Sequence, residues 1–497
     1  MITALCLASI GLAGRAPALE AQSLDSTLQL SLGAALNLAE TASENVGIAK
    51  AGVGRSRGQQ LQARSGYFPQ LTGSATYTRT IRSQFSSLQS GSDTAGTAGC
   101  RAFSPDPSLP IGERVDSLES ALNCLSTANP FAAFRNLPFG REHQYNFGLS
   151  LSQTIFDRRL GGQTAAANAA HRSAEIGLES SRAAVLVDVT AAYYDAILSD
   201  RLLSIAESTL VQAERTLRDV ELGREVGTQP EFELLRARVN RDNQRPAMIQ
   251  RQTNRDLAYL RLKQLLDLPL RLSLSLTTDL GDTTRIPLPP GAADLSASRD
   301  TSIAARAPVR QAAEAVRAAE GRRQVASGQQ LPSLKLSSTF ARIAFPSSTF
   351  DLGTEFVSDW NVALRLEVPL FTGGRIRGDK MVARADLDQA RLQLEQSREL
   401  AALENQDVMS QLDAARARWD ASVGTVEQAT RAYEIAEVRF REGISTQTEL
   451  SDSRLLLQQA QANRAQAARD LQVAKVRADL LHDLPFSSPT SGGSAVR

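Results

Sequence analysis

The chain has few of the residues from which most enzyme sites are built. Among its 497 residues are only three histidines and three cysteines, and aromatic residues make up 5%. The histidines, His143, His171 and His482, lie too far apart for the short ligand spacings of a zinc site. We therefore expect no metal site, no cofactor and no catalytic centre, so the protein is not predicted to be an enzyme.

An excess of charge of one sign is also missing. The 55 Lys and Arg residues nearly balance the 54 Asp and Glu residues, which leaves a formal net charge of +1. A nucleic-acid-binding protein usually carries a basic patch with interleaved aromatic residues, and the sequence has no such segment. We expect no nucleic acid among its partners.

Long hydrophobic runs are absent as well. The apolar residues 4–13 are too few to cross a bilayer, and small residues follow them up to Ala21. This pattern predicts a secretory signal peptide over residues 1–21, the alternative being a buried core helix. No later segment has the ~18 apolar residues of a transmembrane helix. A protein of this composition must enter a membrane, if at all, as β-strands.

Two cysteines lie close together in a loop-like stretch. Cys100 and Cys124 would both reach an oxidising compartment in an exported protein. We expect them to form a disulfide.

The dominant feature of the chain is an internal duplication. Five pairs of segments recur in the same order: 69–71 with 332–334, 145–156 with 360–371, Gly227 with Gly443, Glu233 with Glu449, and Arg238 with Arg454. They predict two structural repeats, residues 22–265 and 266–484, followed by a disordered tail at 485–497. The first repeat carries extra residues rich in Ser, Gly and Pro at 82–143, where the second has only 343–359. Such a difference is typical of an exposed loop.

Each repeat contains two segments with the alternation of a strand, 69–80 and 145–155 in the first and 332–342 and 359–369 in the second. In the last of these, Trp360, Val362 and Leu364 alternate with polar or small residues. About ten residues suffice for a tilted strand to cross a bilayer. Four strands cannot close a barrel, and a bilayer allows no open sheet edge. A membrane location therefore requires several copies, and three would supply twelve strands. The alternative is a soluble β-sandwich, against which the length of the flanking helices argues.

Long helices follow the strands. Residues 159–224 and 377–441 are almost free of proline and would each extend roughly 100 Å as a helix. After Gly227 and Gly443 the chain reverses into further helices that end near Leu268 and Leu481. Leucine and alanine recur along the last of them at steps of three and four residues, as in coiled coils. Helices of this kind form a rod or the wall of a tube.

Taken together, this layout resembles the TolC family of outer-membrane efflux proteins. The resemblance covers nearly the whole chain, from residues 30–36 to about Leu484. Its strongest markers are residues 66–71 before the first strand, 369–374 after the fourth, and the two glycine turns. The order and the duplication of these motifs carry the resemblance.

The resemblance implies a mainly α-helical protein with a β-barrel part: a homotrimer with a 12-stranded barrel in outer-membrane lipid and an α-helical barrel across the periplasm. It also implies partners, namely a periplasmic adaptor (membrane fusion) protein and an inner-membrane pump. The adaptor would dock on the turns, through the residues that follow: Val226, Gly227, Thr228, Gly443 and Ile444.

Acidic residues ring the narrow end of the pore in this family. Glu449 and Asp452 hold the matching positions, and three copies of each would favour cations. The alternative is an ordinary solvated helix face. Well-known members close the pore with an Arg and a Tyr, at positions where this chain has Ser445 and Phe440. Since Glu233 is retained on the opposite turn, we expect Glu233 and Phe440 to contribute to a gate that depends on packing.

The predicted function is that of the outer-membrane duct of a tripartite efflux or type I secretion system, which exports small molecules or proteins. The alternative from another class is a periplasmic coiled-coil adaptor or scaffold without a membrane barrel. The apolar alternation of the strands and the predicted signal peptide favour the duct.

Overall fold

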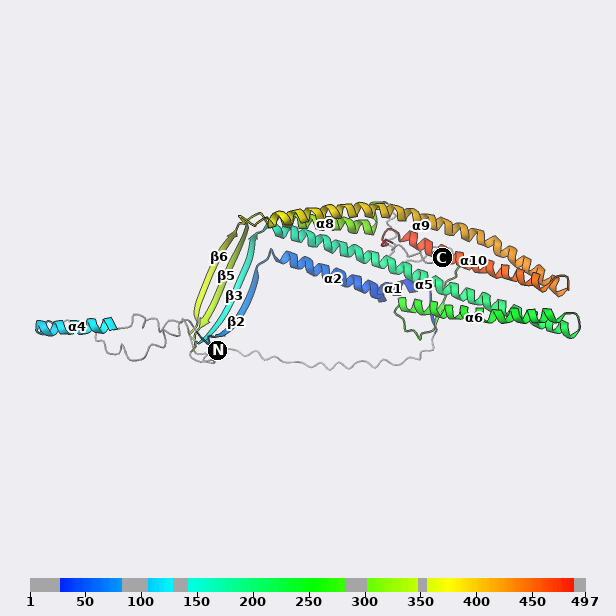
Figure 1. The fold of residues 1–497 in the computed structure, drawn as a ribbon, viewed down its shortest axis with the longest axis horizontal. Coiled ribbons are helices and arrows are strands. Elements are labelled where there is room, and N and C mark those ends of the chain that lie inside the picture. Colours follow the sequence, from blue (N-terminus) through cyan, green and yellow to red (C-terminus); the bar gives the residue numbers. More distant parts are fainter. Residues whose placement is uncertain (1–26, 83–105, 128–141, 282–301, 347–354, 487–497) are drawn as a thin grey trace. The chain divides into compact units, whose positions relative to one another are not determined.

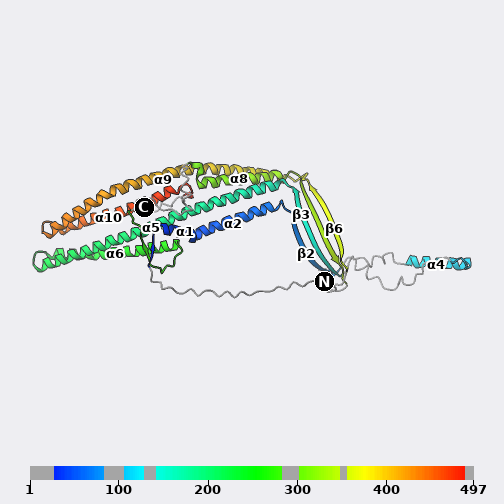
Figure 2. The same ribbon diagram turned by 180° about the vertical axis from the view of Figure 1, so that it is seen from behind.

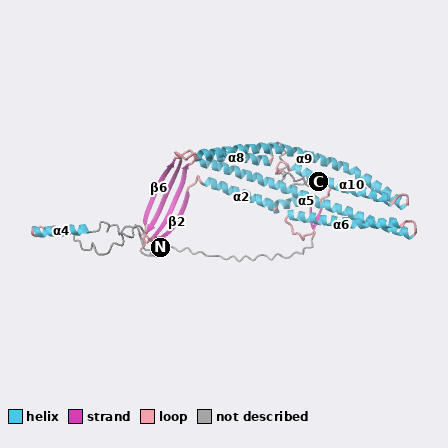
Figure 3. Ribbon diagram, in the orientation of Figure 1, coloured by secondary structure: helices cyan, strands magenta, loops and turns pink. Residues whose placement is uncertain are grey.

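The computed structural model describes residues 27–82, 106–127, 142–281, 302–346 and 355–486. Contacts divide the chain into two units, one mainly helical (1–60, 165–322 and 382–497) and one built on a sheet (61–164 and 323–381). Each unit takes segments from both halves of the sequence, so the predicted repeats are interleaved in space. Figure 3 distinguishes the helices from the strands by colour. The predicted repeat boundaries stay a prediction.

Long antiparallel helices form the helical unit, and Figures 1 and 2 show α6 returning along α5 and α10 along α9. The helices are α1 (Leu32–Ala42), α2 (Glu44–Ser65), α5 (Arg158–Glu225), α6 (Glu231–Leu265), α8 (Ala307–Gly328), α9 (Arg375–Arg441) and α10 (Gln447–Asp479). The two longest have 68 and 67 residues, as the sequence predicts. Ala, Arg, Leu and Glu are their commonest residues, and these residues have high helix propensity.

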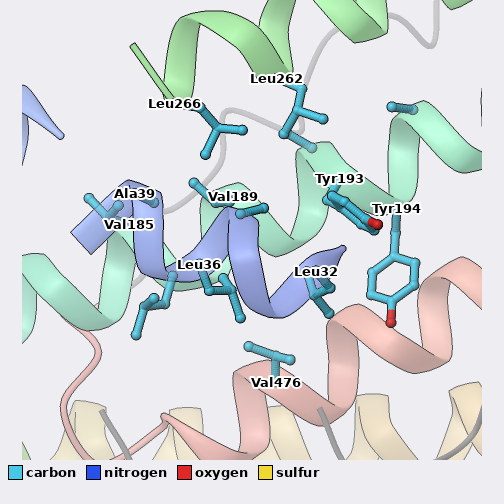
Figure 4. Close-up of a cluster of buried hydrophobic side chains, with 14 of the residues drawn as sticks. Leu32, Leu36, Ala39, Val185, Val189, Tyr193, Tyr194, Leu262, Leu266 and Val476 are labelled. Carbon is cyan, nitrogen blue, oxygen red and sulfur yellow. The ribbon is translucent and has the colours of Figure 1, made fainter. Parts of the chain in front are cut away.

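The main core of this unit forms where α1 packs among the long helices. Leu32 and Leu36 of α1 are almost fully buried, and Figure 4 shows them among side chains of α5, α6 and α10. Tyr193 and Tyr194 of α5 fill the same cluster, with their rings edge to face. Burial of each such leucine contributes about 1.5–3 kcal/mol to folding. The short helix α1 therefore holds the long helices together at this level.

Two short parallel strands, β1 (Leu28–Leu30) and β4 (Leu274–Leu276), lie beside this core. The Tyr193 hydroxyl donates to the Leu30 carbonyl over 2.9 Å, so the side chain is satisfied at its buried end. These strands connect the start of the chain to the segment after α6, and the sequence pattern did not predict them.

A buried arginine links α9 to the segment before α8. Arg306 follows the 3-10 turn η3 (Ile303–Ala305) and donates to the Glu404 carboxylate over 2.9 Å and to the Asn405 side chain over 3.1 Å. Its guanidinium also lies over the Phe486 ring. Since removing one member of a buried ion pair leaves the other charge uncompensated, this arrangement ties α9 to the segment before α8.

The second unit contains a four-stranded antiparallel sheet in the order β2-β3-β5-β6. The strands are β2 (Gln70–Arg79), β3 (His143–Phe156), β5 (Ser333–Ala344) and β6 (Val357–Glu367). They occupy the four predicted segments to within a few residues. The two hairpins join through β3 and β5, with a register shift between Thr154 and Phe156. Each outer strand, β2 and β6, has a described partner on one side only.

The loop expected over residues 82–143 holds a helix, α4 (Ile111–Thr127). Ile111, Val115, Leu118 and Leu122 recur on one face of it, a helical period that the Ser, Gly and Pro content of the surrounding segment obscured. The predicted signal peptide at 1–21 and Cys100 lie outside the described residues, as does the tail from 487 onward. In the part of the chain that is described, no helix is both long enough and apolar enough to cross a membrane.

Candidate functional site

The ends of the long helices form two turns with the same backbone hydrogen bonds. In the first, 226–230, the amides of Gly227 and Thr228 donate to the carbonyls of Arg224 and Gly223 over 3.0 and 2.8 Å. In the second, 442–446, the amides of Gly443 and Ile444 donate to Phe440 and Arg439 over 3.0 and 2.8 Å. Gly227 and Gly443 have φ of 79° and 71°, a region in which a Cβ is strained. Glycine at these places is therefore what allows the reversal.

Both turns present apolar side chains to solvent. Val226 is 68% exposed and Ile444 is 67% exposed, and Thr228 beside the first is also exposed. The structure brings together on this end of the helical unit all five residues that were predicted for docking.

The helices that leave the turns start differently. Pro230 precedes α6 and offers no side-chain cap, whereas the Thr446 hydroxyl accepts a bond of 3.4 Å from the Glu449 amide at the start of α10. The Glu449 carboxylate also lies 3.5 Å from the Arg439 guanidinium. Glu449 thus has a local role in its own turn. Asp452 is exposed one turn along the helix.

Phe440 lies between the two helix pairs. Its half-buried ring packs against Leu217 and Leu234 of the α5–α6 pair and also against Tyr433 and Leu450 of the α9–α10 pair. A single aromatic side chain therefore belongs to both apolar clusters near the turns. The role of Phe440 in a gate stays a prediction.

Gln447 makes a polar link between the same two pairs. The side chain is 2% exposed, and in the amide orientation that satisfies both ends its nitrogen donates to the Glu233 carboxylate over 2.7 Å. The nitrogen also lies 3.2 Å from the Glu233 backbone carbonyl. Because a buried amide that loses its partner is costly, this contact favours keeping the α6 and α10 starts together.

A family model described as outer membrane efflux protein matches residues 129–267 and 299–480. These segments make up more than half of the chain. The chain belongs to the outer membrane efflux protein family. The predicted family and the outer-membrane location are thereby confirmed.

Two proteins of Pseudomonas putida are similar in sequence to this chain. The toluene efflux pump outer membrane protein TtgF is 26% identical over 65% of this chain, and the pyoverdine export outer membrane protein OpmQ is 27% identical over 67%. The match to TtgF spans 65% of that protein's own length. Among solved structures, the Campylobacter jejuni CmeC outer membrane channel covers 93% of this chain and 87% of its own with a TM-score of 0.69 at 17% identity. The fold is therefore that of these channels, as predicted.

Sequence reasoning missed the partner of Glu233. It placed Glu233 and Phe440 at a gate but did not identify Gln447, whose burial depends on the packing of two distant hairpins. A local signal was present, because Thr446 to Glu449 has the spacing of a capping box and so predicts the helix start. That signal fixes the place of Gln447 on the first turn of α10, although not its contact.

Two expectations about residue chemistry stay predictions. Whether Glu449 and Asp452 face a pore depends on other copies of the chain. The Cys100–Cys124 disulfide stays a prediction, since Cys100 lies outside the described residues. Among the residues with described positions, no group of three His, Cys, Asp or Glu could hold a metal ion.

Proposed function

We propose that this family member is the outer-membrane duct of a tripartite export system and that it works as a homotrimer. The observation that carries the proposal is the sheet of unit 2, whose edge strands β2 and β6 each have one described neighbour. In a bilayer an unpaired strand edge costs several kcal/mol for each unsatisfied group. Pairing β6 of one copy with β2 of the next removes every edge, and three copies give a twelve-stranded barrel.

The length of the helices in the helical unit supports a duct that crosses the periplasm. Helices of 68 and 67 residues are each about 100 Å long at 1.5 Å per residue. Three copies of two helix pairs would line a tube of that order of length. We propose that this tube crosses the periplasm and that the exposed Val226 and Ile444 contact a periplasmic adaptor protein bound to an inner-membrane pump.

In this proposal the pump, and not the duct, selects the exported molecule. The names of the relatives refer to toluene and to pyoverdine, which are chemically unlike, although both proteins are similar in sequence to this chain. A common duct with different cargo is consistent with selection at the pump. We propose no catalytic role for the chain itself, and we do not favour the scaffold alternative, since a scaffold would need no sheet with open edges.

The first test is the mass of the native particle after gentle detergent extraction, with the cell fraction recorded. We expect a particle of three chains from the outer-membrane fraction, because the four-stranded sheet of one chain cannot close. A monomer or dimer from the periplasm would overturn the duct and favour the scaffold.

A further inference from the structure

A polar cavity lies between α5 and α10, within the helical unit. Its volume is 230 Å³. The residues around it are spaced three or four apart on each helix: Arg201, Ser204, Ile205, Ser208, Thr209 and Gln212 on α5, and Arg454, Leu457, Gln458 and Gln461 on α10. This is the spacing of two helix faces that oppose each other. The lining contains two arginines, three hydroxyls and three amides, but no carboxylate.

Arg454 forms the buried side of the cavity. It is 5% exposed, yet it makes no ion pair and no hydrogen bond with any residue that the structure describes. Burial lowers the pKa of its guanidinium from the ordinary value, and the group that opposes this shift is Tyr433, not an acid. A buried charge is normally paired, because its loss of hydration is otherwise uncompensated. Within the described part of the chain no carboxylate neutralises this guanidinium, which lines the cavity.

The counterpart of Arg454 in the first repeat is paired with a carboxylate. Arg238 is the counterpart of Arg454 in the duplication, and it is paired with Glu221 over 3.3 Å on the helix beside it. The counterpart of Glu221 is Glu437, but no ion pair joins Glu437 to Arg454 in the described part of the chain. The two counterpart arginines thus differ in their surroundings, because Arg238 is paired with a carboxylate and Arg454 lines the cavity.

The remaining lining suits an oxyanion. A guanidinium presents a planar fork of N–H donors that matches two oxygens of a phosphate or a carboxylate. The hydroxyls of Ser204 and Ser208 and the side-chain amides of Gln458 and Gln461 add further donors around the same space. Arg201 is exposed at the rim, where its positive charge would attract an anion from solvent.

We propose that this cavity binds one small oxyanion per chain, with Arg454 as its buried anchor and Arg201 at its entrance. The bound anion neutralises Arg454 and bridges α5 to α10, so it stabilises the helical unit. The site lies between two helices of one chain, so the proposal is independent of the proposed duct function.

The test uses full-length protein in detergent and inorganic phosphate as the probe, at constant ionic strength kept with chloride. We expect saturable binding of one phosphate per chain by calorimetry, and a rise in Tm of about 2–4 °C at saturating phosphate. In Arg454→Gln the affinity should fall at least tenfold and the Tm rise should vanish. The matched control, Arg238→Gln, should bind as the unaltered protein does.

A second variant guards against misfolding of Arg454→Gln. Arg201→Gln alters an exposed side chain, and it should weaken phosphate binding severalfold while leaving the Tm without phosphate unchanged. A parallel titration with acetate distinguishes the two kinds of oxyanion, and saturable binding of either supports the site. The absence of saturable binding of both, or equal binding by Arg454→Gln and Arg238→Gln, would overturn it.

Discussion

At the scale of single residues, Glu449 has a local contact in its own turn and a predicted role in the pore. In one chain it follows the Thr446 cap and lies 3.5 Å from Arg439, so part of its charge is balanced locally. Such an exposed pair contributes about 0–1 kcal/mol to stability. A pore role requires that the negative charge of Glu449 outweigh the positive charge of Arg439 where three copies would meet. The exposed Asp452 would add to this negative charge.

The double variant Glu449→Ala with Asp452→Ala tests the pore role. We expect its preference for cations over anions to fall severalfold, because six negative charges leave the narrow end of a trimer. The measurement is the reversal potential across a planar bilayer under a salt gradient. Glu434→Ala, an exposed acid on α9, serves as the control. An unchanged reversal potential in the double variant would remove both residues from the pore.

The link between Gln447 and Glu233 leads to a prediction about closure. Gln447→Leu keeps the size of the side chain but removes the donor, so Glu233 loses its 2.7 Å partner. We expect more frequent open events and a larger mean conductance in planar bilayers, since the contact favours the paired arrangement. Gln459→Leu, at an exposed position of the same helix, should leave the recordings unchanged. If both variants behave alike, Gln447 is not part of the gate.

At the scale of elements, glycine has opposite effects in the turns and in the helices. Gly443 has φ of 71°, where an added Cβ is strained, although there is open space around it. Gly424 lies within α9 and also has open space around it. The same substitution should therefore act in opposite directions at the two sites, through backbone conformation alone.

Gly443→Ala should destabilise the helical unit by about 1–2 kcal/mol, the cost of a left-handed residue with a side chain. Gly424→Ala should stabilise it by about 0.5–1 kcal/mol, because alanine is the better helix former. Thermal unfolding followed by circular dichroism in detergent would show the two shifts. Shifts of the same sign would contradict the account of the turn.

At the scale of the whole molecule, the two faces of the proposed barrel's sheet would meet lipid on one side and water on the other. Residues of β6 alternate between apolar side chains such as Val362 and Leu364 and smaller or polar ones such as Ala363. Along its length β6 is exposed in one chain. In a barrel the apolar face would meet lipid and the other face water.

Leu364→Arg tests this assignment. A charged residue on the lipid face costs about 2–4 kcal/mol near the middle of the bilayer. We expect severalfold less protein in the outer-membrane fraction for Leu364→Arg than for the matched control Ala363→Arg, by quantitative immunoblotting. Equal amounts of the two variants would mean that β6 does not present Leu364 to lipid.

The elements themselves were predictable from the sequence because their signals are local. The alternation of β6, the two glycines of the turns and the long proline-poor helices each depend on neighbouring residues, and the duplication showed that they occur twice. The sequence did not predict the helix α4, because the Ser, Gly and Pro content of the segment around it is typical of a loop. The pairing of β1 with β4 joins segments far apart in the chain, and no local pattern marks it.

The sequence alone determined the order of helices and strands, the place of each turn and the family. Only the tertiary structure decided that Phe440 packs against both helix pairs, that Gln447 reaches Glu233, and that Arg454 is buried while Arg238 is paired. The reason is physical: φ and ψ preferences and apolar periods act within a few residues. By contrast, a contact between distant side chains depends on how whole helices pack, and duplicated residues with equal local sequence signals meet different neighbours.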